Sequence, residues 1–247
     1  MDVVQKRIKI CLDHGNTELD LSYMKLKRLP PNLPNFIQIL YCHNNQLSEL
    51  PKNLPTSLRE LHCQNNLINK MPSCLPAYLE KLYISNNNIR ELPSNLPDSL
   101  KVLFCCDNEI EELSLNLPIG IECMDISRNR IKKFQLNRLS SLIGVYCDDN
   151  LLTDLPPNLI TVSPLIIILT CLHNKYLHIP KKYALHFNID ETPNYNKMAS
   201  CIQQIWRVKK CKQIMIGMMQ NNNNVLYDSF RFYGDINIIQ LIVQFIY

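Results

Sequence analysis

Residues 79–99 read LEKLYISNNNIRELPSNLPDS, and the 21 residues on either side of them follow the same pattern. Residues 58–78 read LRELHCQNNLINKMPSCLPAY, and residues 100–120 read LKVLFCCDNEIEELSLNLPIG. The ninth position of each copy is an asparagine, Asn66, Asn87 or Asn108, and apolar residues stand at the first, fourth, sixth and eleventh positions. A fixed period of this length predicts a repeat architecture in which every copy forms one coil.

The same pattern extends in both directions along the chain. The asparagines that share this position at steps of 21 residues are Asn45, Asn66, Asn87, Asn108, Asn129 and Asn150. A first copy has Met24 in place of the asparagine, and a last copy has Asn174, which follows Asn150 by 24 residues. We expect the three extra residues, near Thr161–Ser163, to bulge from the coil. Eight copies therefore cover residues 17–180.

The pattern L-x-x-L-x-L-x-x-N-x-L resembles the leucine-rich repeat. The additional L-P-x-N-L-P of residues 50–55 and 92–97 resembles the short repeats of secreted bacterial effectors and of giant viruses that infect amoebae. The resemblance implies an α/β repeat solenoid, a horseshoe with a parallel sheet on its concave side, in which the asparagine amides bond the backbone of each turn. Because paired prolines fix φ and remove N–H donors, we predict an extended or polyproline-like convex side.

Three regions follow from this pattern. Residues 1–16 are predicted to cap the array with a helix over residues 2–14, which Gly15 would end. Residues 17–180 form the array of eight repeats. Residues 181–247 are predicted to be a helical tail, with a linker at 181–196, a helix at 197–219 and a terminal segment at 225–247.

Charge and apolar segments restrict the class of protein. The net charge is +4, but residues 1–180 contain 18 basic and 18 acidic side chains, so the excess lies in the tail. A balanced array is not expected to bind nucleic acid, which requires a basic face. We see neither a secretory signal nor an apolar run of the roughly 20 residues that cross a membrane. We expect a monomeric intracellular protein without cofactors, located in the cytoplasm of its own cell or of a host cell.

The cysteines are predicted to lie in the core. Five of the eleven occupy one repeat position, three residues before the asparagine: Cys42, Cys63, Cys105, Cys147 and Cys171. This position normally holds an inward leucine, and a free cysteine behaves as a small apolar residue. No C-x-x-C pair indicates a metal site. Free cysteines also fit a reducing compartment.

The residue four before each asparagine should point outward from the concave sheet. These residues are Asp20, Tyr41, His62, Tyr83, Phe104, Asp125, Tyr146 and Thr170. We predict that they are exposed and that a protein partner binds Tyr41, His43, His62, Tyr83, Phe104, Asp125 and Tyr146, because aromatic residues are enriched in interface hot spots. The flanking polar residues that would set specificity are His43, Gln64, Arg59, Glu60, Lys81 and Lys101. Alternatively, the aromatic residues only suit strands and stack on their neighbours.

The tail contains a second motif. Residues 199–212 read ASCIQQIWRVKKCK and resemble the IQ motif, with Ile202, Gln203, Arg207 and Lys212 at its defined positions and Trp206 before the arginine. Val208 stands where the motif prefers glycine, so the match is incomplete. The resemblance implies binding of a calmodulin-like protein, which an apolar stripe flanked by basic residues favours. Alternatively, this helix covers the last repeat, because solenoids require caps at both ends.

The sequence favours a non-enzymatic protein interaction module. Effectors with similar repeats often carry a ubiquitin ligase domain behind the array, and we expect the 67 residues after Pro180 to be too few for that domain. The catalytic site of that ligase domain has the pattern C-x-D. The array contains this pattern at Cys105–Asp107 and Cys147–Asp149, where the repeat turns the cysteine inward. The alternative is an effector-type protein that is related to these ligases and lacks their catalytic domain.

Overall fold

The computed structural model describes residues 3–113, 116–135, 139–157, 159–163, 165–166 and 168–179. The chain divides into two compact units, Met1–Phe187 and Asn188–Tyr247, and the described residues all belong to the first. The predicted linker, the IQ-like helix with Ile202, Gln203, Trp206, Arg207 and Lys212, and the terminal segment all lie outside the described residues. Their proposed boundaries stay predictions.

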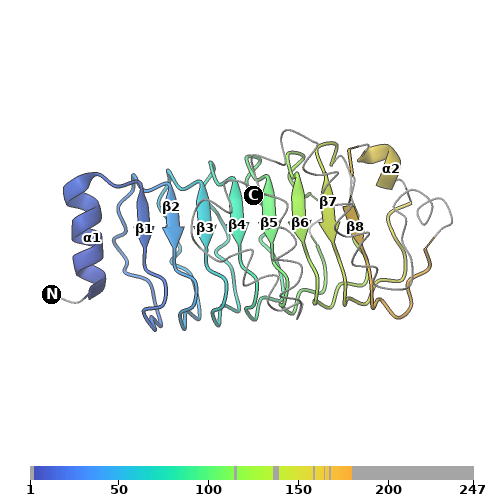
Figure 1. Ribbon diagram of the computed structural model, residues 1–247, viewed down its shortest axis with the longest axis horizontal. Coiled ribbons are helices and arrows are strands. Elements are labelled where there is room, and N and C mark those ends of the chain that lie inside the picture. The colour runs from blue at the N-terminus through green and yellow to red at the C-terminus, as the bar shows by residue number, and fades with distance from the viewer. Residues whose placement is uncertain are drawn as a thin grey trace, which may run out of the picture. The chain divides into compact units, whose positions relative to one another are not determined.

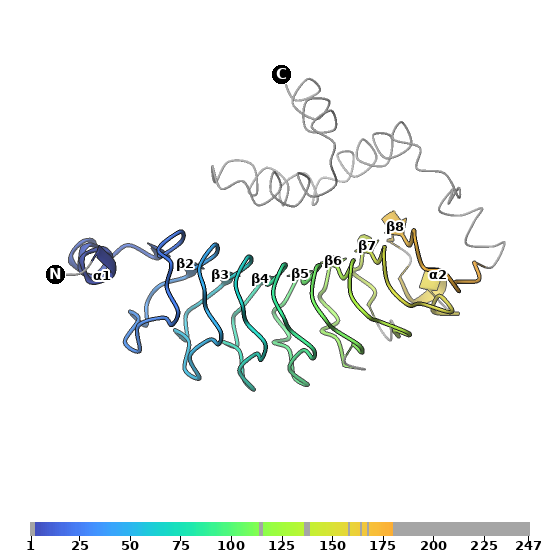
Figure 2. The ribbon, with the colours of Figure 1, turned by 90° about the horizontal axis from the view of Figure 1, so that it is seen from below.

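Eight three-residue strands form one parallel sheet in chain order (Figure 1). They are β1 (Glu18–Asp20), β2 (Ile39–Tyr41), β3 (Glu60–His62), β4 (Lys81–Tyr83), β5 (Val102–Phe104), β6 (Cys123–Asp125), β7 (Gly144–Tyr146) and β8 (Ile168–Thr170). The register pairs equivalent repeat positions, as in Leu61 with Leu82 and His62 with Tyr83. The predicted parallel solenoid is therefore confirmed. Figure 2 shows the strands along the inner side of a shallow arc and the connecting loops along the outer side.

The core is a stack of identical positions from successive coils. The middle residue of every strand is buried: Leu19, Leu40, Leu61, Leu82, Leu103, Met124, Val145 and Leu169. The residue two positions further on is buried in the same way, as Cys63, Ile84 and Cys105 show. Full burial of such a side chain stabilises the fold by about 1.5–3 kcal/mol. One coil cannot cover its own apolar face, so each depends on its two neighbours.

A helix covers the open end of the first coil. It is α1 (Val3–His14), and its buried residues Val4, Ile8 and Cys11 recur at the spacing of one helical face. Gly15, at φ +63°, ends it in a Schellman motif in which Gly15 N–H bonds Leu12 O at 3.4 Å and Asn16 N–H bonds Cys11 O at 3.0 Å. The predicted capping helix and its glycine stop are confirmed.

The convex side has almost no regular structure. In the described parts of residues 17–179, the one helix there is α2 (Leu159–Val162), which lies in the 24-residue repeat. The extra residues near Thr161–Ser163 thus form a short helical turn, where the sequence predicted a bulge. Ser163 Oγ donates to Leu139 O at 2.9 Å and so joins this turn to the preceding coil. No helix within the described ranges is long and apolar enough to cross a bilayer.

Candidate interaction face

The asparagine column holds consecutive coils together. Asn87 Nδ2 donates to Cys63 O at 3.1 Å in the preceding coil and to Ile84 O at 3.0 Å in its own. Its Oδ1 accepts the N–H of Ile68 at 3.0 Å. Equivalent bonds recur at Asn45, Asn66, Asn108, Asn129, Asn150 and Asn174. Buried backbone groups at the turn are thereby satisfied, as the repeat pattern predicted.

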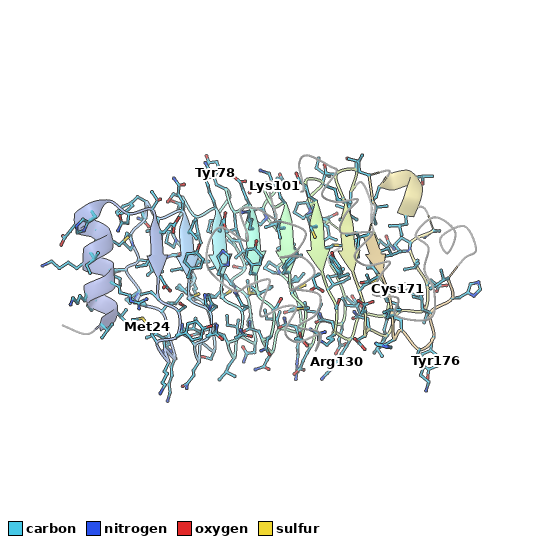
Figure 3. All side chains as sticks on the ribbon, in the orientation of Figure 1. Met24, Tyr78, Lys101, Arg130, Cys171 and Tyr176 are labelled. Atoms are coloured by element: carbon cyan, nitrogen blue, oxygen red, sulfur yellow. The ribbon has the colours of Figure 1, made fainter. Side chains whose placement is uncertain are left out.

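The first coil lacks this asparagine but uses that of the second. Asn45 Oδ1 accepts the N–H groups of Met24 at 3.0 Å and Leu26 at 2.9 Å. Because no coil precedes the first one, an amide at Met24 would find no carbonyl on that side. Figure 3 shows Met24 beyond the ends of the strands, beside α1. The exception at Met24 is thus a consequence of its terminal place.

A second polar row, which the sequence reasoning missed, lies one residue before the asparagine column. Its members all have left-handed φ values between 49° and 56°: Asn44, Asn65, Asn86, Asp107, Arg128, Asp149 and His173. The first three form an amide chain, in which Asn65 Nδ2 donates to Asn44 Oδ1 at 3.1 Å and Asn86 Nδ2 donates to Asn65 Oδ1 at 2.7 Å. Asparagine tolerates this conformation better than most residues. The adjacent asparagines at 44–45, 65–66 and 86–87 were the available signal.

Four rings form a continuous row across the middle of the concave face, here called the aromatic row: Tyr41, His62, Tyr83 and Phe104. Ring centroids are 4.7 Å apart for Tyr41 and His62, 4.4 Å for the stacked pair His62 and Tyr83, and 5.5 Å for Tyr83 and Phe104. Offset and edge-to-face ring pairs at such distances attract each other. The row occupies strands β2 to β5, at the outward register that the sequence predicted.

The predicted exposure of this row is wrong for most of its length. Tyr41, His62 and Tyr83 are buried, with only 3% of Tyr83 exposed, whereas Phe104 and Tyr146 are partly exposed. Neighbouring rings cover one another because parallel strands lie only about 4.8 Å apart. Asp125 is buried as well, because its carboxylate turns back to accept the N–H of Ser127 at 3.0 Å.

Three buried polar residues lie at the amino-terminal end of the aromatic row: His43, His62 and Gln64. The rings of Tyr23 and Tyr41 meet His43 edge-on, with centroids 5.3 and 6.3 Å away. Burial, and then the nearby His62, lower the pKa of His43 to about 4. Burial also lowers the pKa of His62, although Glu60 partly opposes this change. Both imidazoles are therefore neutral at pH 7.

The charged residues beside the row are paired. Glu80 accepts from Arg59 Nη1 at 2.6 Å and from Lys101 Nζ at 2.7 Å. Lys101 lies at the edge where the strands begin (Figure 3). Glu60 accepts from Lys81 Nζ at 2.8 Å. Burial opposes the charge of Glu60, but hydrogen bonds from His62 and Lys81 outweigh it and lower the pKa of this carboxyl. Four of the predicted specificity residues, Arg59, Glu60, Lys81 and Lys101, are thus in ion pairs, two of them with Glu80, which the sequence did not single out.

Two buried aspartates, Asp125 and Asp148, lie in the carboxy-terminal third of the face. Burial raises the pKa of Asp125 and of Asp148. Asp148 accepts the hydroxyl of Thr170 at 2.7 Å and the N–H of Leu172 at 2.6 Å. The concave face therefore changes from a row of rings over β2–β5 to a mixed part over β6–β8, whose outward residues are Asp125, Tyr146 and Thr170.

The five repeat cysteines are buried and free. Burial raises the pKa of the Cys171 thiol to about 12, and it also raises the pKa of Cys105 and Cys147. Thiols of this kind are inert, because the thiolate is the reactive form. Both C-x-D cysteines are thus core residues. Within the described ranges, no three His, Cys, Asp or Glu side chains are grouped to hold a metal ion.

Comparison with known proteins agrees with this architecture. A family model described as a leucine rich repeat matches residues 78–98. The leucine-rich repeat domain of a Shigella effector is 32% identical with a TM-score of 0.59, and the match covers 64% of this chain and 69% of that chain. The leucine-rich effector YopM of Yersinia pestis is 32% identical with a TM-score of 0.62 over 69% of this chain and 47% of that chain, so the chain spans about half of YopM.

A more distant likeness extends to the fold alone. The functional domain of InlJ from Listeria monocytogenes, which is described as including a cysteine ladder, is 19% identical with a TM-score of 0.50. That match covers 76% of this chain and 48% of that chain. No curated protein sequence matches the chain significantly. The shared repeat, the shared sheet and the identity to the Shigella domain together place the chain in one family: it belongs to the leucine-rich repeat proteins.

Proposed function

We propose that this protein is a non-enzymatic interaction module that binds a protein partner on its concave face. The aromatic row is the observation that carries the proposal. Tyr41, His62, Tyr83 and Phe104 lie in contact along four neighbouring strands, although no packing in the core requires rings at these outward positions. Aromatic residues near the centre of a face, with charged residues around them, are typical of interface hot spots.

The size of the face suits a protein partner better than a metabolite. Eight parallel strands at about 4.8 Å spacing give a sheet roughly 35 Å along its curve. The charge pairs Arg59–Glu80–Lys101 and Lys81–Glu60 border the row. Such paired groups fix the orientation of a partner more than they increase its affinity.

The test is proximity labelling in the cell that naturally contains the protein. The wild type is compared with a variant in which Tyr41, Tyr83 and Phe104 are all changed to serine. We expect at least one labelled protein to disappear with the variant and to bind the purified wild type at least tenfold more tightly. Tyr78→Ser is the matched control, because Tyr78 is 64% exposed and lies outside the strands. Equal labelling of every partner by the triple variant would exclude the concave face.

We further propose that the protein is effector-like and acts inside a cell, with the bacterial-effector and giant-virus repeats as its models. The 32% identity to two bacterial effector domains supports this class. A relationship to repeat-containing ubiquitin ligases is tested by a ubiquitin-charging assay on the whole chain. We expect no ubiquitin thioester, because burial keeps Cys105 and Cys147 as thiols.

Binding of a calmodulin-like protein through residues 197–219 is a separate proposal, which the IQ-like sequence supports. Trp206 is the single tryptophan of the chain, so the tryptophan fluorescence of the whole protein reports on this segment alone. We expect its emission to shift when a tryptophan-free calmodulin is added, with or without calcium, and Arg207→Glu to weaken the change. No shift in either condition would remove the proposal.

A further inference from the structure

Three polar atoms beside the aromatic row have no hydrogen-bond partner in the described part of the chain: His43 Nε2, His62 Nδ1 and Gln64 Oε1. His43 and His62 are each 5% exposed and Gln64 is 8% exposed. Buried polar groups are almost always paired, so an unpaired cluster requires an explanation. His43 belongs to one coil, and His62 and Gln64 belong to the next. These two coils are bonded here, since Asn44 N–H bonds Gln64 O at 3.0 Å and Cys42 N–H bonds His62 O at 2.8 Å.

The hydrogen bonds of the imidazoles decide which of these atoms is a donor. Asn44 Oδ1 accepts from Asn65, so Asn44 Nδ2 is its amide nitrogen and donates to His43 Nδ1 at 2.8 Å. The proton of neutral His43 is therefore on Nε2, which is a free donor. His62 Nε2 lies 3.4 Å from the Glu60 carboxylate and donates to it. His62 Nδ1 is therefore a free acceptor.

The cluster thus offers one donor and two acceptors, because Gln64 Oε1 is also an acceptor. The complementary ligand group has one acceptor and two donors. A primary carboxamide has this set in one flat group, with a carbonyl oxygen and an NH₂. A carboxylate would place acceptors against two acceptors, and an ammonium has no acceptor for His43. A backbone amide or a hydroxyl has one donor and would leave one acceptor unpaired.

The surroundings also favour a flat, uncharged group. The Tyr41 ring lies 4.7 Å from the His62 ring and 6.3 Å from the His43 ring, so the two imidazoles flank one ring. Burial lowers the pKa of both histidines, so neither supplies a positive charge at pH 7. Both acceptors belong to the coil of β3 and the donor belongs to the coil of β2. The two strands lie roughly 4.8 Å apart, a span that one carboxamide can cover.

We propose that His43, His62 and Gln64 form a carboxamide subsite, which takes the side-chain amide of an asparagine or glutamine presented by a protein partner. This inference rests on the proposed function, because it names the chemistry of the partner for the same face. The subsite lies over β2 and β3, at the amino-terminal end of the aromatic row.

The test selects binders from a phage-displayed random 12-residue peptide library on the immobilised whole protein. Isolated peptides are then measured by calorimetry against the wild type and the triple serine variant of the aromatic row, which identifies those that bind the concave face. We expect these to share an asparagine or glutamine at one position. Replacing a shared Gln by the isosteric Glu or by Met should weaken binding at least tenfold.

Protein variants locate that amide in the subsite. His62→Phe and Gln64→Leu keep the size of each side chain and remove one acceptor, so either should abolish most of the difference between the Gln and Met peptides. Ser85→Ala is the control, because Ser85 occupies the same repeat position one coil further on. Circular dichroism confirms folding, and if one variant does not fold the other decides.

The outcomes separate the two proposals. In one result, peptides that need the aromatic row share no carboxamide; in another, their carboxamide contributes equally to binding in the wild type, His62→Phe and Gln64→Leu. Either result overturns the subsite and leaves the binding face intact. Peptides that bind elsewhere, or an empty selection, overturn the subsite and also count against the face as a peptide-binding surface. Shared carboxamides that lose their advantage in His62→Phe or Gln64→Leu establish it.

Discussion

The asparagine column and the outward column of the same strands have the same period but very different composition. The first is Asn45 to Asn174 with a single exception at Met24, whereas the second contains acidic, aromatic, imidazole and hydroxyl side chains. Each column asparagine bonds the backbone of two coils, so every copy faces the same geometric demand. The outward side chains instead contact neighbouring rings or bond groups nearby, as His62 does with Glu60 and Asp125 with Ser127 N–H. The column with one residue type therefore belongs to the scaffold. The column whose residue types vary forms the surface that can acquire specificity.

The largest expected effect comes from breaking the asparagine column at Asn87. Asn87→Ala would leave Ile68 N–H without its partner. Cys63 O and Ile84 O would each lose one of two amide donors, because Asn66 and Asn108 still bond them. The unpaired N–H costs about 1–3 kcal/mol and each of the two lost bonds about 0.5–1.5 kcal/mol, so we expect a loss of about 3 kcal/mol in the free energy of unfolding. Urea denaturation followed by circular dichroism measures it.

The neighbours of Asn87 are controls of the same residue type. Asn86 bonds Asn65 at the surface and has φ 54°, so Asn86→Ala should cost about 1 kcal/mol, mostly from the strained backbone. Asn88 is exposed and makes no side-chain hydrogen bond within the described residues, so Asn88→Ala should change stability by less than about 0.5 kcal/mol. Equal losses at all three positions would show that the column has no special role.

The sequence could predict the scaffold because one period determines both the bonding and the inward positions. It placed Asn87 at the turn, Cys105 in the core and Tyr83 on the concave side correctly. It could not predict the exposure of Tyr83, because exposure depends on the contacts between side chains of neighbouring coils. The sequence also did not predict the row of left-handed residues. An asparagine such as Asn86 indicates this backbone conformation, but the same repeat position holds Arg128 and His173 in later coils.

We expect acidification to lower the free energy of unfolding through the two histidines of the concave face, His43 and His62. Burial lowers the pKa of His43 to about 4 and that of His62 in the same direction, so the unfolded chain takes up protons first as the pH falls below 6.5. Stability is therefore lost between pH 6.5 and about 4. One pKa unit corresponds to about 1.4 kcal/mol, and after allowance for partial solvation we expect a loss of about 2 kcal/mol by pH 4.5.

Other groups titrate near this range, so the histidines must be isolated by substitution. Asp20 and Glu60 near the rings favour protonated imidazoles, whereas Lys81 opposes them. The raised pKa of Asp125 acts in the opposite sense, because the folded state then gains protons first on acidification. We expect the double variant His43→Phe/His62→Phe to make the urea midpoint of unfolding depend less on pH between 6.5 and 4.5. An unchanged slope would mean that the histidines titrate normally.

The stacked pair His62 and Tyr83 measures how much the rings stabilise one another. Their centroids are 4.4 Å apart and their planes meet at 18°. A double-mutant cycle with His62→Ala and Tyr83→Ala should give a coupling of about 1 kcal/mol. The cycle is measured at pH 7.5, where both imidazoles are neutral. A coupling near zero would favour a row that is organised only when a partner binds.

The smallest effect is expected at the charges beside the row. Glu80 bonds Lys101 and Arg59, whose side chains remain about half exposed, so Glu80→Gln should cost less than about 1 kcal/mol. The hydrogen bond from Lys101, and then that from Arg59 against the effect of burial, lower the pKa of Glu80, so this contribution is present above pH 4.5 and lost below it. It should also shrink from 50 mM to 1 M salt, because exposed charges are screened. The Asn87→Ala loss should not change with salt, since that bond is neutral and buried. If the two losses were similar in size and in salt dependence, the outward charges would belong to the scaffold, and the concave face could not vary in sequence without loss of the fold.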